Sequence, residues 1–249
     1  MTASLPSHRF HFMNRFLIPA ATLAFLTLTL SAQSAEPVRI LPLGDSITQG
    51  GAKPDEYTYR LPLFRMLKDA GVNFDFVGSR QQGLKGDFEW PRIDGEPFDT
   101  DHEGVYGIRT AKALARLPEA MKKWDETPDI AIIHLGTNDL KSPETFHEDV
   151  IVPLRDIVGL LRRGNPEVVV LLSHLHWPSG PAGNLRERVE ALAAGLDSDL
   201  SPVRTVSYQD GFETKPGTDL LDGAHPGPSG SEKMARAYFE AMQPWLPEE

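Results

Sequence analysis

The sequence predicts a single three-layer α/β domain in which helices cover both faces of a parallel sheet. Short runs rich in Val, Ile and Leu alternate along the chain with longer segments whose apolar residues recur at helical spacing. Strict alternation of strand and helix implies right-handed crossovers and a sheet that is covered on both faces. The composition fits such a domain, because 40% of the 249 residues are hydrophobic and 24% are charged.

The expected strands are short, and Gly, Pro, Asn or Asp residues bound them, as in buried parallel sheets. In chain order they are residues 38–43, 73–77, 129–135, 167–173 and 203–207. The expected helices are residues 59–70, 110–124, 144–163, 184–196 and 229–245. Within the fourth of these, Leu185, Val189 and Leu192 recur on one face, and we expect such stripes to pack in the core.

The segment 78–107 is too long and too rich in Gly, Pro and Asp for a passive connection, so we expect it to cover another part of the protein. Its acidic residues are expected to form a solvated face that discourages anionic substrates. They are Glu89, Asp94, Glu96, Asp99, Asp101 and Glu103.

Residues 1–35 have the pattern of a cleaved secretory signal peptide. Arg9 and Arg15 precede an apolar run at residues 16–30, and small residues follow at 31–35. Either Met1 or Met13 is the start. The apolar run is shorter than the ~20 residues of a membrane span, so an uncleaved anchor is the weaker alternative. We therefore expect one domain at residues 36–249, secreted or periplasmic, with no stable membrane insertion after cleavage.

Charge and cysteine content exclude several classes of function. The formal net charge is −10, and the first 35 residues carry two Arg and no acid, so the remaining domain is more acidic still. An acidic domain is a poor partner for nucleic acids and for anionic membranes. The chain contains no Cys, which excludes disulfides, thiol catalysis and Cys-ligated zinc.

Polar clusters follow four of the expected strands. Ser46 follows the first strand and Asn138 follows the third. Gly107 ends the long segment after the second strand, and Asp222 and His225 come after the fifth. In open parallel sheets, ligands bind beyond the carboxyl ends of the strands. We therefore expect the four clusters to meet at one edge of the sheet.

These residues supply the parts that acyl transfer requires. Ser46 is the candidate nucleophile, His225 is its base, and Asp222 is the acid that orients the base. The backbone N–H groups of Ser46 and Gly107 and the side-chain amide of Asn138 are the candidate donors to the oxyanion. Each cluster alone is typical of an ordinary turn, and only their joint occurrence at successive strand ends indicates catalysis.

The same residues resemble the four sequence blocks of the SGNH, or GDSL-type, hydrolase superfamily. The blocks are Gly44-Asp45-Ser46-Ile47, Gly107, Gly136-Thr137-Asn138-Asp139 and Asp222-Gly223-Ala224-His225. The chain is most similar to carbohydrate esterase family 3, whose members are typically acetyl xylan esterases. The resemblance implies a five-stranded sheet of flavodoxin-like order 2-1-3-4-5, the same triad and oxyanion hole, and no metal ion or organic cofactor.

The sequence departs from that family around the second block. Where the family usually has His-Ser-Gly-Trp, this chain has Val105-Tyr106-Gly107-Ile108. The Gly of the oxyanion hole is kept, but the Trp and its neighbours are replaced. The substrate therefore does not follow from the resemblance alone.

We expect a serine esterase that hydrolyses short-chain acyl esters, chiefly acetyl esters, on a small molecule or on a plant-type polysaccharide such as xylan. The alternatives on the same scaffold are a lipid-directed acylhydrolase, a lysophospholipase and a thioesterase, although the segment 78–107 offers little for a lipid groove. A metallophosphoesterase would need more His and Asp ligands at the strand ends. A non-catalytic carbohydrate-binding domain would not need the complete set of catalytic residues. The oligomeric state stays open.

Other polar and aromatic residues have less specific signals. His174 and His176 follow the fourth expected strand, where hydrogen bonding within the loop is favoured over a metal site because no third ligand is evident. Asp45 is expected to form a turn, and Arg60 to have a structural role. Aromatic residues in the loops are expected either to stack on sugar rings or to pack within the loops. They are Trp90, Tyr106 and Trp177.

Overall fold

A parallel sheet forms the centre of the structure. Its main strands are β1 (Val38–Gly44), β2 (Phe74–Phe76), β6 (Ile130–His134), β7 (Val169–Ser173) and β8 (Val203–Val206). They lie in the order β2-β1-β6-β7-β8, and every neighbouring pair is parallel. The five expected strands and the implied order 2-1-3-4-5 are confirmed, with ends that differ only slightly from the predicted ranges.

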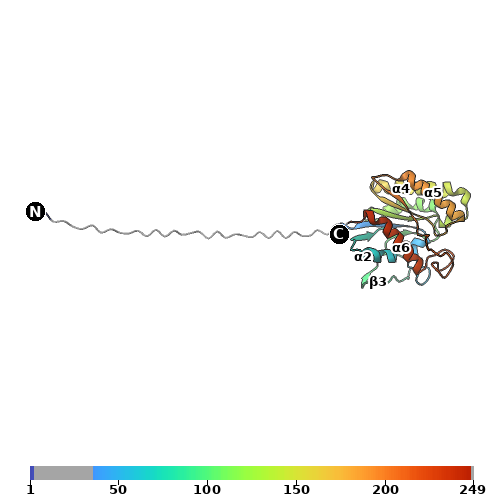
Figure 1. Ribbon diagram of the computed structural model, residues 1–249, viewed down its shortest axis with the longest axis horizontal. Coiled ribbons are helices and arrows are strands. Elements are labelled where there is room, and N and C mark those ends of the chain that lie inside the picture. The colour runs from blue at the N-terminus through green and yellow to red at the C-terminus, as the bar shows by residue number, and fades with distance from the viewer. Residues whose placement is uncertain (3–35, 248–249) are drawn as a thin grey trace. The chain divides into compact units, whose positions relative to one another are not determined.

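The computed structural model describes residues 1–2 and 36–247 and is shown in Figure 1. Residues Ala35–Glu249 form one compact unit. The expected signal peptide at residues 1–35 lies almost entirely outside the described residues and stays a prediction. Within the described ranges, no helix is both long enough and apolar enough to cross a membrane.

Helices cover both faces of the sheet (Figure 1). Helices α2 (Arg60–Asp69) and α6 (Pro228–Met242) lie on one face, and α3 (Thr110–Met121), α4 (Val152–Gly164) and α5 (Gly180–Leu196) lie on the other. The expected helix at 144–163 starts irregularly, because a 3₁₀ turn (Pro143–Thr145) and a π turn (His147–Ile151) precede α4. Pro153, in the first turn of α4, has no N–H to donate to a regular helical ladder.

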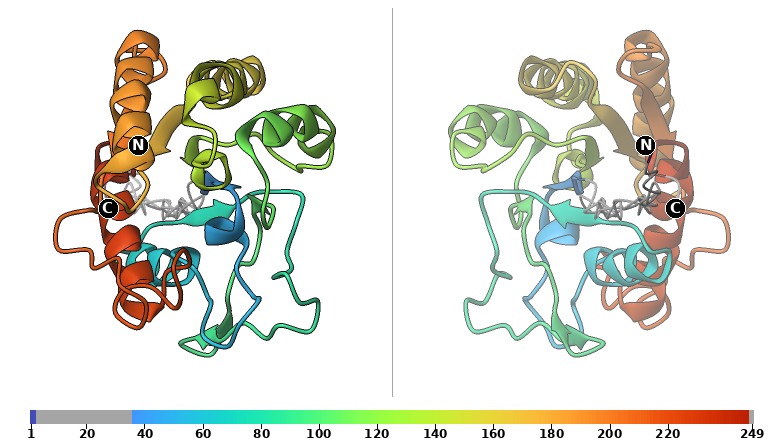
Figure 2. Two further views of the ribbon diagram at one scale, coloured as in Figure 1. Left: turned by 90° about the vertical axis from the view of Figure 1, so that its right-hand side faces the viewer. Right: turned by 90° about the vertical axis from the view of Figure 1, so that its left-hand side faces the viewer.

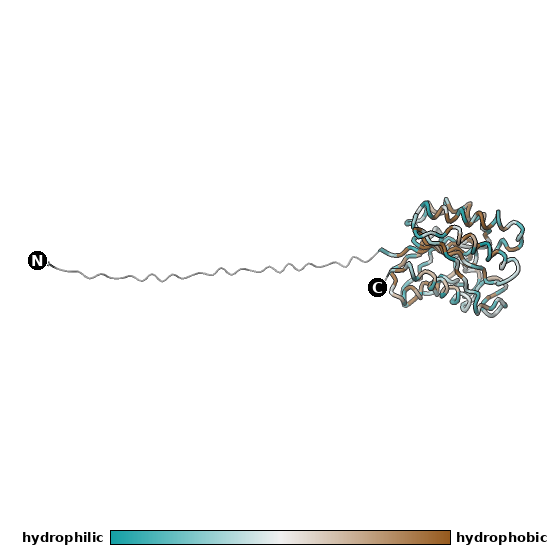
Figure 3. Tube along the Cα trace, turned by 45° about the horizontal axis from the view of Figure 1, so that its top comes forward, coloured by the Kyte–Doolittle hydropathy of each residue, from teal (hydrophilic) through white to brown (hydrophobic). Residues whose placement is uncertain are grey.

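Alternate residues of the strands face opposite layers, so the sheet separates two hydrophobic cores. In β1, Ile40 packs with α2 and α6, whereas Leu41 and Leu43 pack with α3, α4 and α5. In β6, Ile132 and Ile133 divide between the two cores in the same way. Figure 3 shows the most hydrophobic stretches of the domain gathered around the sheet. This arrangement explains why the strands read as continuous apolar runs.

The segment 78–107 returns to the sheet. Strand β5 (Glu103–Gly104) pairs in parallel with the last residues of β1, and β3 (Arg92–Ile93) and β4 (Glu96–Pro97) form a small antiparallel hairpin. The rest of the segment runs as irregular chain along the edge of the domain (Figure 2). The sequence does not predict these strands, because pairings of two residues are too short to show a periodic pattern.

The acidic residues of this segment do not share one solvated face, which corrects the prediction. Glu103 is buried, and its carboxylate accepts hydrogen bonds from Ser79 and from the indole N–H of Trp124. Asp99 accepts from the backbone N–H of Phe76 at 2.7 Å, and burial raises its pKa to about 6. The members that are exposed as predicted are Glu89, Asp94 and Glu96.

Candidate active site

Ser46 follows the last residue of β1 after Asp45 alone, as the first residue of the short helix α1 (Ser46–Gln49). Gly44 permits this tight connection, because a Cβ atom there would lie 2.6 Å from the carbonyl oxygen of His134. The first backbone N–H groups of a helix have no acceptor within the helix, so the N–H of Ser46 is available to a ligand. The predicted turn is therefore one helical turn that presents Ser46 at its N-terminus.

Asp45 caps this helix. The carboxylate is fully buried, and it accepts hydrogen bonds from the N–H of Ile47 at 3.0 Å and from the amide of Asn138 at 3.3 Å. Burial raises the pKa of Asp45 to about 6. These contacts agree with the expected structural role of Asp45 at the turn.

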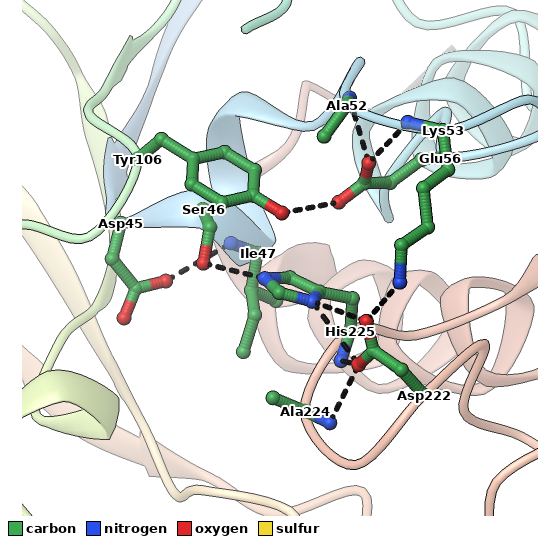
Figure 4. Close-up of polar contacts among 10 residues, drawn as sticks. All are labelled: Asp45, Ser46, Ile47, Ala52, Lys53, Glu56, Tyr106, Asp222, Ala224 and His225. Atoms are coloured by element: carbon green, nitrogen blue, oxygen red, sulfur yellow. Dashed lines mark hydrogen bonds and ion pairs between the residues drawn. The ribbon is translucent and has the colours of Figure 1, made fainter.

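The structure brings Ser46, His225 and Asp222 into one hydrogen-bonded chain (Figure 4). The Nε2 atom of His225 lies 3.0 Å from Oγ of Ser46, and its Nδ1 atom lies 3.0 and 3.1 Å from the two carboxylate oxygens of Asp222. Ser46 is buried, and the His225 side chain is 16% exposed. With its hydrogen on Nδ1, the imidazole has a free lone pair on Nε2 that can accept the serine proton.

The segment before α6 places Asp222 and His225 on the same side of the chain. The Oδ1 atom of Asp222 accepts from the backbone N–H groups of Ala224 at 2.8 Å and His225 at 2.9 Å, which fixes the turn between the two side chains. Burial raises the pKa of Asp222, but hydrogen bonds from Lys53 and from the backbone and ring of His225 outweigh it and hold that pKa well below its usual range. The carboxylate is therefore ionised at neutral pH.

The side-chain amide predicted for the oxyanion hole belongs to a 3₁₀ turn (Thr137–Asp139) that follows β6. Asp139 anchors the turn by accepting from the N–H and the hydroxyl of Thr110, at 3.1 and 2.9 Å. The amide of Asn138 donates to the carbonyl of Ile108 at 2.9 Å and to Asp45 at 3.3 Å. These two bonds hold the amide between the segments that carry Ile108 and Asp45.

Gly107 occupies a turn between β5 and α3. It is exposed and has φ = 72°, a conformation that favours glycine. Within the part of the chain that the structure describes, its backbone N–H donates no hydrogen bond. The neighbouring N–H of Tyr106 is held by the side-chain oxygen of Gln49 at 2.7 Å, so α1 fixes the position of this turn.

Sequence reasoning misses two charged residues next to the candidate triad. The ammonium group of Lys53 pairs with Oδ2 of Asp222. Glu56 is 2% exposed and accepts from the backbone N–H groups of Ala52 and Lys53 at 2.7 and 2.9 Å. Both residues lie in a stretch with Gly and Pro that is typical of a surface loop, so only their closeness to Ser46 in the sequence could have indicated a role.

His174 and His176 pack beneath the loops, and the hydrogen bonding predicted for their rings is not seen among the described residues. The Nε2 atom of His174 lies 3.4 Å from a carboxylate oxygen of Glu190, and the ring of His176 stacks on Phe212. No group of three or more His, Cys, Asp or Glu side chains within residues 36–247 is placed to hold a metal ion.

The loop aromatic residues divide between packing and the site. The guanidinium carbon of Arg60 lies 4.8 Å from the ring centroid of Trp90. Trp177 packs against the core beside α5. The ring of Tyr106 stacks on His225, with centroids 5.2 Å apart and an interplanar angle of 25°.

Arg60 is fully buried and donates to backbone carbonyls, which agrees with the predicted structural role. The acceptors belong to Thr48, Gln49 and Thr100.

The fold is that of the SGNH-type ester hydrolases. Residues 40–238 match the model of the GDSL-like Lipase/Acylhydrolase family, and the chain therefore belongs to this family. A multidomain esterase of Ruminococcus flavefaciens is 28% identical over 94% of this chain, and an arylesterase of Vibrio mimicus is 25% identical over 90% of it. The chain spans 33% of the length of the Ruminococcus protein and 91% of the length of the Vibrio protein.

Solved structures share the fold. A carbohydrate esterase family 3 protein from Talaromyces cellulolyticus has a TM-score of 0.68 and 23% identity, over 82% of this chain and 96% of that one. A family 3 carbohydrate esterase of Clostridium thermocellum has a TM-score of 0.66 and 23% identity, over 82% of this chain and 94% of that one. An acetyl esterase with a bound acetate ion has a TM-score of 0.68 at the same identity. The predicted SGNH hydrolase fold is thereby confirmed.

Proposed function

We propose that the protein is a serine esterase that removes short acyl groups, chiefly acetyl groups, from the hydroxyls of a carbohydrate such as xylan. The observation that carries this proposal is the hydrogen-bonded chain of Ser46, His225 and Asp222 at the carboxyl edge of the sheet. It supplies a nucleophile, a base and an acid that orients the base. Membership of an acylhydrolase family supports ester hydrolysis, and the fold shared with carbohydrate esterases supports a sugar ester as the substrate.

The proposed acylation step begins when Nε2 of His225 takes the proton of Ser46 and Oγ attacks the acyl carbonyl carbon. The oxyanion that forms accepts hydrogen bonds from the backbone N–H groups of Ser46 and Gly107 and from the amide of Asn138. The ionised Asp222 stabilises the protonated ring of His225. His225 then donates its proton to the departing sugar oxygen, and the acyl group stays on Oγ.

Deacylation repeats these steps with water. His225 takes a proton from a water molecule, whose oxygen attacks the acyl-enzyme carbonyl, and the same three donors hold the second oxyanion. Return of the proton to Oγ of Ser46 releases the carboxylic acid and restores the free enzyme. No step requires a cofactor, because the side chains supply and recover every proton.

The proposal is tested by the acyl-chain preference of the purified protein. Rates on p-nitrophenyl esters from acetyl to decanoyl are measured alongside acetate release from acetylated xylan. We expect the highest rate on the acetyl ester and release of acetate from xylan. Both activities should be lost in Ser46→Ala, and a chelator should not affect either activity of the parent protein. A maximum at long chains without acetate release would favour the lipid-directed alternative, and full activity in Ser46→Ala would refute serine catalysis.

We also propose that the protein is exported to the periplasm or the medium. The order of basic, apolar and small residues within positions 1–35 supports this proposal. After expression of the full chain in a bacterium, N-terminal sequencing of the exported protein should find a start near residue 36. Full-length protein confined to the cytosol would contradict it.

A further inference from the structure

The loop between α1 and α2, residues 50–59, contacts the acid of the proposed triad directly and reaches the base through Tyr106. The ammonium group of Lys53 in this loop pairs with Oδ2 of Asp222 (Figure 4). Glu56 in the same loop accepts a hydrogen bond from the hydroxyl of Tyr106 at 3.4 Å, and the Tyr106 ring is the one stacked on His225. One loop therefore contacts Asp222 directly and supports the ring of His225 through Tyr106.

The backbone of this loop is held in place from within. The buried carboxylate of Glu56 accepts the N–H groups of Ala52 and Lys53, which closes the turn that carries the Lys53 side chain. Asp55 and Thr58 have φ = 61° and 63°, in the left-handed region that costs a β-branched residue such as Thr conformational energy. Such strain persists only where the surroundings fix the backbone, and it clusters at functional sites.

The contact with Lys53 completes the hydrogen bonding of the Asp222 carboxylate. Its Oδ1 atom accepts from two backbone N–H groups and lies 3.1 Å from Nδ1 of His225. Its Oδ2 atom lies 3.0 Å from the same Nδ1 and pairs with the ammonium of Lys53. Without Lys53, Oδ2 would face water on that side, and water would compete with the imidazole for the carboxylate. The side chains of Lys53 and Asp222 are 45% and 34% exposed, so this ion pair contributes little to folding stability.

We propose that Lys53 is a positioning residue for Asp222. Its ammonium group holds the carboxylate in the orientation that keeps the Nδ1–H of His225 aligned, while the stacked ring of Tyr106 limits the tilt of the imidazole. The inference rests on the proposed function, because it requires Asp222 and His225 to act on Ser46. A residue that aligns the base affects the chemical steps and not ground-state binding, so kcat should depend on Lys53 and KM should not.

The test compares Lys53→Met with Lys53→Arg on p-nitrophenyl acetate. Lys53→Met keeps the length of the side chain but removes its charge, and we expect kcat to fall by about tenfold or more while KM changes by less than about twofold. Lys53→Arg keeps a cation that can bind the carboxylate and should restore most of kcat. Lys122→Met is the matched control, because it breaks another exposed pair, with Glu119 at 2.6 Å, and should leave kcat unchanged.

Thermal unfolding and Ser46→Ala separate the possible outcomes. A parental kcat in Lys53→Met overturns the inference, and so does a raised KM at constant kcat, which would make Lys53 a substrate-binding residue. A loss of kcat that matches a loss of folded protein overturns it as well. If Ser46→Ala is inactive, such results refute only the role of Lys53. Retained activity in Ser46→Ala would instead refute the proposed function, and the inference with it.

Discussion

Asn138 shows how a single side chain joins separate parts of the site. Its amide bonds to the carbonyl of Ile108, next to Gly107, and to the carboxylate of Asp45, next to Ser46. The side chain therefore ties together the three segments that carry the proposed oxyanion donors. The sequence indicates the amide as a donor, but the two anchoring contacts appear only in the structure. Their partners belong to segments that follow other strands and are distant from Asn138 in the sequence.

Replacing Asn138 by Ala is expected to lower kcat by about 10²–10³-fold, because one donor to the oxyanion is lost. Steady-state kinetics on p-nitrophenyl acetate measure this change. Asn184→Ala removes an exposed amide on α5 and serves as the control, with an expected kcat equal to that of the parent. If folded Asn138→Ala kept the parental kcat, Asn138 would have no part in the oxyanion hole.

Among the elements, the carboxyl end of β1 positions the site. β1 pairs with β2 along its first half, with β5 at its last residues, and with β6 along the opposite edge, so three segments converge where Ser46 begins α1. The pairing of Gly44 with Gly104 brings the loop that carries Gly107 alongside α1. This convergence requires a very close approach of backbones, and residues without Cβ atoms allow it.

Replacing Gly44 by Ala should therefore destabilise the protein. The new Cβ would lie 2.3 Å from the hydroxyl oxygen of Thr48 and 2.6 Å from the carbonyl of His134, so backbone must move. We expect the free energy of unfolding to fall by about 1–3 kcal/mol, measured by urea denaturation.

A glycine in open space provides the control for this substitution. Gly195 lies in α5, is exposed, and would place its Cβ more than 4 Å from any atom beyond its chain neighbours and the nearby backbone of its own helix. Gly195→Ala should raise stability by about 0.5–1 kcal/mol, because alanine is the better helix former. Equal effects of the two substitutions would contradict the close approach at Gly44.

For the whole molecule, the two cores enclose titratable groups close to the carboxyl edge of the sheet. His134 is fully buried and hydrogen-bonded to the hydroxyl of Tyr208 at 2.9 Å, and His176 is 1% exposed. Burial lowers the pKa of His134 to about 4. Burial, together with the nearby rings of His134 and His225, lowers the pKa of His176 to about 3. Both rings thus stay neutral in mild acid while the protein is folded.

We expect His176 to make the protein less stable as the pH falls. Below about pH 6.5 the unfolded chain protonates this ring and the folded protein does not, so the stability present above that pH is lost as the pH approaches 3. His176→Phe keeps a ring against Phe212 but takes up no proton. Between about pH 6 and 4 the free energy of unfolding of this variant should fall less steeply with pH than that of the parent. The two slopes should differ by about 1.4 kcal/mol per pH unit.

Asp99→Asn provides a comparison of opposite sign. Burial raises the pKa of Asp99 to about 6, so the folded protein protonates this carboxyl near pH 6. The unfolded chain protonates it only near pH 3.8. This carboxyl adds stability as the pH falls through that window, and the variant lacks the contribution. Its free energy of unfolding should therefore fall more steeply than that of the parent. The free energy of unfolding of the three proteins is measured by urea denaturation at each pH. If it depended on pH in the same way in all three, both assignments would be contradicted.

The sequence by itself determined the layers, the strand order through family resemblance, and the residues that can meet at the carboxyl edge. Apolar periodicity and polar residues at strand ends are local patterns, and they place Ser46, Asn138 and His225 on one edge without any knowledge of packing. Tertiary structure alone decided the burial of Glu103, the pairing of β5 and the contact of Lys53 with Asp222. Lys53 and Asp222 are 169 positions apart, and no local pattern encodes a contact that depends on how two loops fold back on the sheet.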